Sequence, residues 1–87
     1  MSLTRSEKAQ TARELSANLD KSRRGLPEVA AALGWTEDRL HHTVEMATGA
    51  DPADVWELRD WLDRTVRDGG GNPVPYTVLT ESARPEG

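Results

Sequence analysis

Residues 26–46 contain two short apolar helical patterns separated by a single glycine, and this arrangement most limits how the chain can fold. Pro27 suits the first turn of the first pattern, where its missing amide proton costs nothing. Ala30 is small enough for a second helix to pack across it, and Gly34 can adopt the positive φ of a tight turn. Thr36 is a suitable N-cap for the second helix. The spacing therefore predicts a helix-turn-helix over residues 26–46, the unit most often used to place a helix in the major groove of DNA.

A longer helix is predicted ahead of this unit. Thr4 and Glu7 have the spacing of a capping box, in which each residue bonds the backbone N–H of the other. The helix that follows is expected over about residues 5–22. Its inward stripe, chosen for apolar residues at helical spacing, consists of Ala9, Ala12, Leu15 and Leu19.

The C-terminal half predicts one more helix and an extended tail. Asp51 is an N-cap and Pro52 a first-turn proline for a long helix over about residues 52–68. Three consecutive glycines end this helix, and two prolines favour an extended segment over residues 73–79. We therefore expect an all-α fold, a four-helix domain that contains a helix-turn-helix and carries an extended C-terminal tail. The expected limits are a single helical domain over residues 1–81 and a disordered end over residues 82–87.

The size of the chain and its lack of cysteine limit how the domain is stabilised. A chain of 87 residues forms one small domain, and without cysteine it has neither a disulfide nor a thiolate–metal site. Oligomerisation is the remaining source of stability, so we expect a homodimer. No apolar run approaches the roughly 18 residues of a membrane helix, and no apolar signal core follows the first residues. We therefore expect a cytoplasmic protein that makes no membrane contact.

Charge is unevenly distributed along the chain. The net charge is −4, with +3 in residues 1–25, −3 in residues 26–46 and −4 in residues 47–87. An acidic domain is a poor partner for phosphate, so any nucleic-acid contact would depend on the first segment. The second helix of the predicted helix-turn-helix opens with Glu37 and Asp38, which DNA phosphates repel unless cations surround them.

Binding of double-stranded DNA would require two groups of contacts. Cations near the amino end of the first helix of the unit would contact phosphates, and residues of the second helix would approach bases. The alternative interpretation of the cations is a solvated cluster at a helix end, where positive charge favours the helix dipole. The candidate contacts are Lys21, Arg23 and Arg24 for phosphates, and Thr36, Arg39 and His42 for bases.

No combination of residues indicates catalysis or a bound cofactor. Glu37–His41 and Asp38–His42 have a spacing that can bind a divalent ion, but such pairs also occur as exposed neighbours and no third ligand is nearby. The carboxylates of residues 52–68 alternate with arginines, which is typical of a solvated helix face. We expect a protein that is not an enzyme and has no metal site or cofactor.

Three tryptophans are many for so small a domain and raise the question of a partner surface. Trp56 lies beside the apolar stripe of the long helix, so it is either covered by the tail or exposed as an anchor for a partner. The tail either folds over its own helix or crosses to a second subunit. The candidate partner contacts are Trp56, Tyr76 and Val78.

Five segments spread over nearly the whole chain carry a family resemblance. They are residues 1–4 (MSLT), 11–15 (TAREL), 28–34 (EVAAALG), 51–62 (DPADVWELRDWL) and 73–80 (PVPYTVLT). With these segments the chain resembles a small uncharacterised bacterial family, the domain of unknown function 2316. The resemblance implies a complete domain and brings no assigned activity to any residue.

A looser likeness to the DNA-binding domains of helix-turn-helix repressors is confined to residues 26–46. Two functional hypotheses remain. The motif favours a small dimeric DNA-binding transcriptional regulator. The acidic start of its second helix favours a protein-interaction module that is built on a helix-turn-helix scaffold and does not bind DNA.

Overall fold

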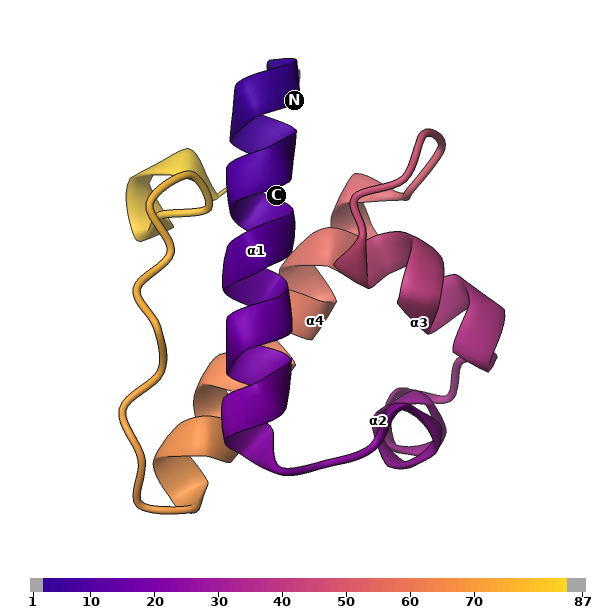
Figure 1. Ribbon diagram of the computed structural model, residues 1–87, viewed down its shortest axis with the longest axis vertical. Helices are drawn as coiled ribbons and strands as arrows, with labels where there is room; N and C mark the ends of the chain where they lie inside the picture. Colours follow the sequence, from indigo (N-terminus) through magenta and orange to yellow (C-terminus); the bar gives the residue numbers. More distant parts are fainter. Residues whose placement is uncertain (1–2, 85–87) are drawn as a thin grey trace.

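The computed structural model describes residues 3–84 (Figure 1). Its elements are α1 (Arg5–Ser22), α2 (Leu26–Leu33), α3 (Glu37–Val44), α4 (Pro52–Asp68) and a short 3-10 helix, η1 (Glu81–Ala83). No β-strand occurs within residues 3–84. The predicted all-α class is confirmed.

Three of the helices begin at side-chain caps that the sequence predicts. The Thr4 hydroxyl accepts from the backbone N–H of Glu7 at 3.1 Å, while the Glu7 carboxylate accepts from the Thr4 N–H at 2.9 Å. Thr36 accepts from the backbone N–H three positions later at 3.1 Å, and Asp51 accepts from the one two positions later at 2.9 Å. These bonds satisfy backbone donors that have no partner inside the helix.

The arrangement of α2 and α3 is consistent with the predicted helix-turn-helix. The two helices pack against each other across a short turn that begins with Gly34 in the left-handed region, at φ 73°. Ala30 is buried, and Trp35 in the turn is buried as well. Leu40 on α3 is fully buried. The small residue, the positive-φ turn and the apolar filling thus lie where the motif needs them.

The second helix of this unit is shorter than expected. We expected it to reach about residue 46, but α3 ends at Val44 and Glu45 forms its C-cap. Met46 has a φ of 54°, a left-handed conformation that interrupts the right-handed helix. Ala47 lies beyond the end of α3 and is half-buried.

One core cluster takes buried side chains from all four helices. Leu15 of α1 and Leu58 and Leu62 of α4 are fully buried. Figure 1 shows α2 and α3 on one side of α1, while the chain after α4 runs back along the other side. Tyr76 and Leu79 from this returning segment, residues 72–80, are buried in the same core. From here on, the tail means residues 72–80, which include the extended segment predicted over residues 73–79.

The buried face of α1 differs from the predicted stripe. Leu15 is the only fully buried residue of the four that we expected to point inward, and Ala9 is exposed. The other buried positions of α1 are polar: Thr11, Glu14 and Asn18. The tail covers this side of the helix, so its polar residues are removed from water together with Leu15.

The described part of the C-terminal end lies beside α4. Arg84 donates two hydrogen bonds to the Asp60 carboxylate, and the Glu81 carboxylate of η1 lies 3.3 Å from the Arg59 guanidinium. The disorder that we expected over residues 82–87 stays a prediction. Residues 85–87 lie outside the described residues.

Candidate functional site

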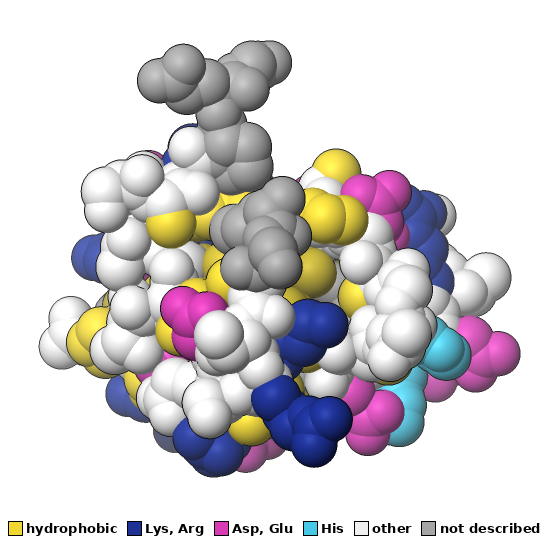
Figure 2. Space-filling view, turned by 90° about the horizontal axis from the view of Figure 1, so that it is seen from above, with side chains coloured by type: hydrophobic (Ala, Val, Ile, Leu, Met, Phe, Trp, Pro, Cys, Tyr) yellow, Lys and Arg dark blue, Asp and Glu magenta, His cyan; other side chains and the backbone are white. Residues whose placement is uncertain are grey.

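The outward face of α3 is exposed and acidic. Five of its side chains are exposed, and one ion-pair contact links two of them, His41 Nε2 to Glu45 Oε1 at 3.4 Å. Figure 2 shows histidine and acidic side chains gathered at the side of the molecule where α3 lies. We call this surface the acidic α3 face. Its members are Glu37, Asp38, His41, His42 and Glu45.

The single arginine of α3 is held by α4. Arg39 donates two hydrogen bonds to the Asp54 carboxylate, at 2.8 Å from Nε and 2.7 Å from a terminal nitrogen. Its guanidinium also lies 4.6 Å from the centre of the Trp35 ring, a cation–π distance. The bonds from Arg39 lower the pKa of the Asp54 carboxyl, so this pair stays charged well into acid. The only positive charge on the predicted recognition helix is therefore already paired.

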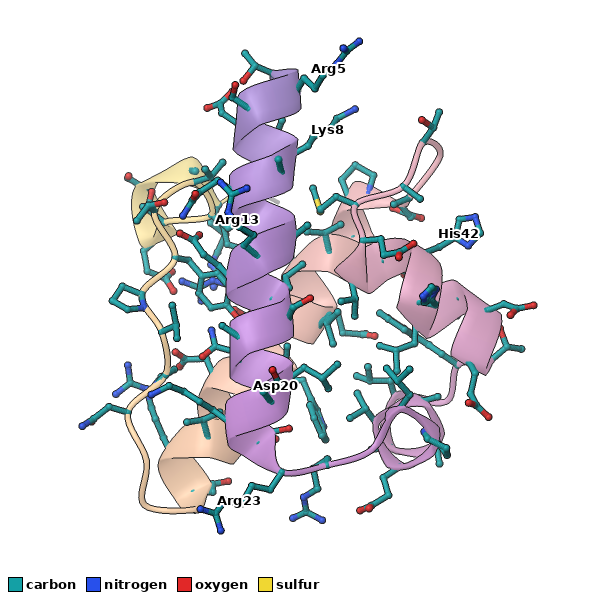
Figure 3. All side chains as sticks on the ribbon, viewed as in Figure 1. Arg5, Lys8, Arg13, Asp20, Arg23 and His42 are labelled. Atoms are coloured by element: carbon teal, nitrogen blue, oxygen red, sulfur yellow. The ribbon has the colours of Figure 1, made fainter. Side chains whose placement is uncertain are left out.

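The other two candidate base contacts also have local roles. The Thr36 hydroxyl caps α3. His42 Nδ1 lies 3.3 Å from the Asp38 carbonyl oxygen one turn earlier. Figure 3 shows the His42 ring at the outer side of α3, pointing away from the molecule.

The predicted phosphate contacts lie around the connection between α1 and α2, where Arg24 lines one hollow together with His41 and Glu45. Lys21 donates to the Asn72 carbonyl oxygen at 2.9 Å, so it helps hold the tail. Arg23 is the C-cap of α1 in a left-handed conformation, and Arg24 lies 3.5 Å from the Glu28 carboxylate. In Figure 3, Arg23 is at the lower end of α1, far from His42. The structure therefore does not bring the six candidate DNA contacts together on one surface.

A polar clamp on the tail is the site that sequence reasoning missed. Asn18 donates to the Val74 carbonyl oxygen at 3.0 Å and accepts from the Val74 N–H at 2.6 Å. Glu14 accepts from both the backbone N–H and the hydroxyl of Thr77, at 3.0 and 2.7 Å. Their only sequence signal is a spacing of four residues, which any solvated helix face also shows.

Arginine and aromatic side chains hold the far end of the tail. The Arg59 guanidinium lies 5.5 Å from the Trp56 ring and 4.9 Å from the Tyr76 ring, and Arg59 donates to the Leu79 carbonyl oxygen at 3.1 Å. Arg84 lies 4.8 Å from the Trp56 ring and donates twice to Asp60 at 2.9 Å. The bonds from Arg84 lower the pKa of the Asp60 carboxyl.

The predicted partner contacts lie within or beside this group of arginine and aromatic side chains. Trp56 is 6% exposed and Tyr76 is 8% exposed, while Val78 is half-buried. Burial raises the pKa of the Tyr76 phenol to about 12. Of the two arrangements that the sequence leaves open, the described chain has the tail folded over its own α1 and α4. Trp56 is covered and does not stand out as an anchor.

Two further properties bear on the kind of site. Within residues 3–84, no three histidine or acidic side chains are grouped closely enough to hold a metal ion. In the same residues, none of the helices combines the length and apolar character needed to cross a membrane.

The comparisons with known proteins give one match. Neither the curated proteins nor the solved structures include a significant match. Residues 1–86 match the model of a family described as an uncharacterized protein conserved in bacteria, and the chain belongs to this family, the domain of unknown function 2316.

Proposed function

We propose that this domain is a protein-interaction module built on a helix-turn-helix scaffold, and that its acidic α3 face binds a basic segment of a partner protein. The observation that carries the proposal is the charge of that face. Its carboxylates at Glu37, Asp38 and Glu45 are exposed, whereas Arg39 is paired with Asp54. Complementary charge steers a basic partner to this surface and selects against acidic ones.

The same charges oppose binding of DNA through α3. Glu37 and Asp38 occupy the first turn, the part of a recognition helix that contacts base edges. Phosphates repel exposed carboxylates, and the whole chain carries a net charge of −4. The helix offers no unpaired arginine to offset this repulsion, because Arg39 bonds Asp54.

A small dimeric DNA-binding regulator is the second candidate. It is favoured by the packing of α2 on α3 and by the exposed cations Arg23 and Arg24 beside the start of α2. In a helix-turn-helix this end lies near the DNA backbone, so the two arginines would make the phosphate contacts.

One pair of titrations separates the candidates. Fluorescence anisotropy at low salt would measure binding of a labelled mixed-sequence duplex and of a labelled arginine-rich peptide. We expect the peptide to bind and the duplex not to bind. Peptide affinity should fall in Glu37→Gln/Asp38→Asn and remain in Glu57→Gln/Asp68→Asn, which removes the same charge from exposed positions of α4.

The opposite result would support the regulator. Duplex binding that weakens steeply with salt and disappears in Arg23→Ala/Arg24→Ala would assign the function to DNA. Equal peptide binding by the two charge-removal variants would show that general acidity, and not the α3 face, attracts the peptide.

A further inference from the structure

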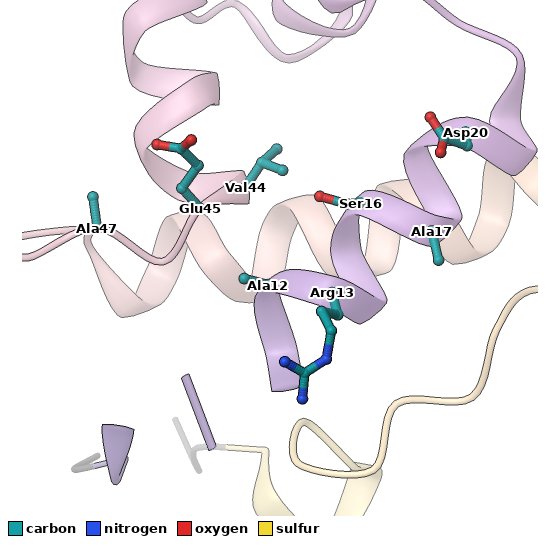
Figure 4. A pocket seen from close by; sticks show the side chains of 8 residues that line it. All are labelled: Ala12, Arg13, Ser16, Ala17, Asp20, Val44, Glu45 and Ala47. Carbon is teal, nitrogen blue, oxygen red and sulfur yellow. The ribbon is translucent and has the colours of Figure 1, made fainter. Parts of the chain in front are cut away.

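A groove runs along α1 on the side that faces the end of α3. It has a volume of about 710 Å³, and Figure 4 shows α1 forming one wall while Val44, Glu45 and Ala47 line the other. The wall from α1 includes Ala12, Ser16 and Ala17, so it carries no large side chain near its middle. A second hollow continues the groove toward α2. Together they form a surface long enough to take a helix.

The charged residues of this wall are placed symmetrically. Arg13 and Asp20 are both exposed and stand seven residues apart, about two helical turns, so they lie on the same face of α1. The midpoint between them falls between Ser16 and Ala17. Each charge is therefore about 5 Å along the axis from the same point, in opposite directions. Figure 4 shows the two side chains at opposite ends of the α1 wall.

We propose that this face binds a second copy of the same chain, with the two α1 helices antiparallel across a two-fold axis between Ser16 and Ala17. Such an axis places Arg13 of each copy opposite Asp20 of the other, giving two equivalent ion pairs. The small residues at the axis let the two helices approach to about 8 Å. This dimer does not rest on the proposed function, and the two surfaces share one residue, Glu45.

The charges of the α1 wall favour a second copy over other occupants. A basic helix lying along this wall would be attracted by Asp20 but repelled by Arg13, and an acidic helix would be attracted by Arg13 but repelled by Asp20. The opposite wall carries one more charge, Glu45, whose carboxylate lies 3.4 Å from His41 Nε2. Within residues 3–84, Asp20 has no ion-pair partner, and the Arg13 side chain bonds the neutral amide of Gln10 at 2.7 Å. Both side chains can therefore pair with a partner that places a negative charge beside Arg13 and a positive charge beside Asp20.

Sedimentation equilibrium over a wide range of concentration tests this dimer. We expect Arg13→Glu and Asp20→Arg each to raise the dimer Kd about tenfold, because both symmetric pairs change from attraction to repulsion. The double variant Arg13→Glu/Asp20→Arg restores opposite charges across the axis and should return the Kd to near the wild-type value. Arg64→Glu, an exposed change on α4, is the matched control and should leave the Kd unchanged.

Three results of the sedimentation experiment would overturn the proposal. One is a wild-type chain that stays monomeric at every concentration. Another is a dimer Kd that changes in neither single variant. The third is a double variant whose dimer Kd is as high as those of the single variants. Circular dichroism of each variant would verify that α1 stays folded. Amide NMR shifts at Ala12 and Ser16 would be followed in two titrations, one with a basic peptide and one with the chain itself. Shifts that change with the peptide but not with the concentration of the chain would assign the groove to another partner and also overturn the dimer.

Discussion

Arg39 and Asp54 form two parallel hydrogen bonds, 2.7 and 2.8 Å long, that join the first turn of α3 to the first turn of α4. The contact orients α3 and, with the Trp35 ring on the guanidinium, fills the angle between the helices. It also pairs the one arginine of α3 with a carboxylate of α4, and the paired arginine side chain stays 48% exposed. This contact therefore partly neutralises the only arginine that α3 presents to a partner.

Removing this ion pair should make stability less dependent on pH. The folded pKa of Asp54 lies below its ordinary value of 3.8, so the pair stabilises the fold above that value and its contribution is lost as pH falls through the folded pKa. We expect Asp54→Asn to lower the Tm at neutral pH. The difference from wild type should shrink as the pH falls below 3.8 and then through the lowered pKa of the folded state. Thermal unfolding, followed by circular dichroism at a series of pH values, measures the Tm of both proteins. A Tm difference that grows in acid would contradict a stabilising role for the Arg39–Asp54 pair.

The polar clamp on the tail should contribute strongly to stability. Asn18→Ala leaves the N–H and carbonyl of Val74 without their partner beneath the tail, and an unsatisfied buried group costs about 1–3 kcal/mol. Urea unfolding would measure this loss. Lys8→Ala, an exposed change on the same helix, is the control and should be nearly neutral. Equal stability of the two variants would mean that the clamp does not hold the tail.

The apolar end of the tail should protect Trp56 from water. Leu79 is fully buried, so Leu79→Ala should destabilise the fold by about 2–5 kcal/mol through lost burial and a residual cavity. Tryptophan emission should shift to longer wavelength as the tail loosens over Trp56. The half-buried Val78→Ala is expected to cost less and to leave the emission unchanged. An unshifted spectrum in a destabilised Leu79→Ala would contradict this role.

The turn between α2 and α3 should tolerate only glycine at its first position. Gly34 has a φ of 73° and no atom near the position of an added Cβ, so Gly34→Ala is opposed by the backbone alone. We expect it to cost about 1–2 kcal/mol in chemical unfolding. Gly69→Ala is the comparison, because its φ of −80° is ordinary and its Cβ would meet only normal contacts at 3.6 Å. A neutral Gly34→Ala would show that the turn can adopt another conformation.

Local signals were enough to predict where the helices lie. Thr4, Thr36 and Asp51 cap helices through bonds to N–H groups two or three residues away, so their effect can be read along the chain. The prediction was less accurate at the end of α3, where Met46 adopts a left-handed conformation that no residue pattern marks. The candidate site was harder to predict because its charges are set by partners distant in sequence.

Interactions within one or two helical turns were enough to predict the four helices, the glycine turn and the acidic start of α3. Long-range packing sets which polar residues are buried and which charges are paired. Asn18 reaches Val74, and Arg39 reaches Asp54, across segments that come together only when the tail and α4 pack on the other helices. Burial and ion pairing depend on those contacts, so the local pattern did not mark Asn18 as buried and left Arg39 as a candidate DNA contact.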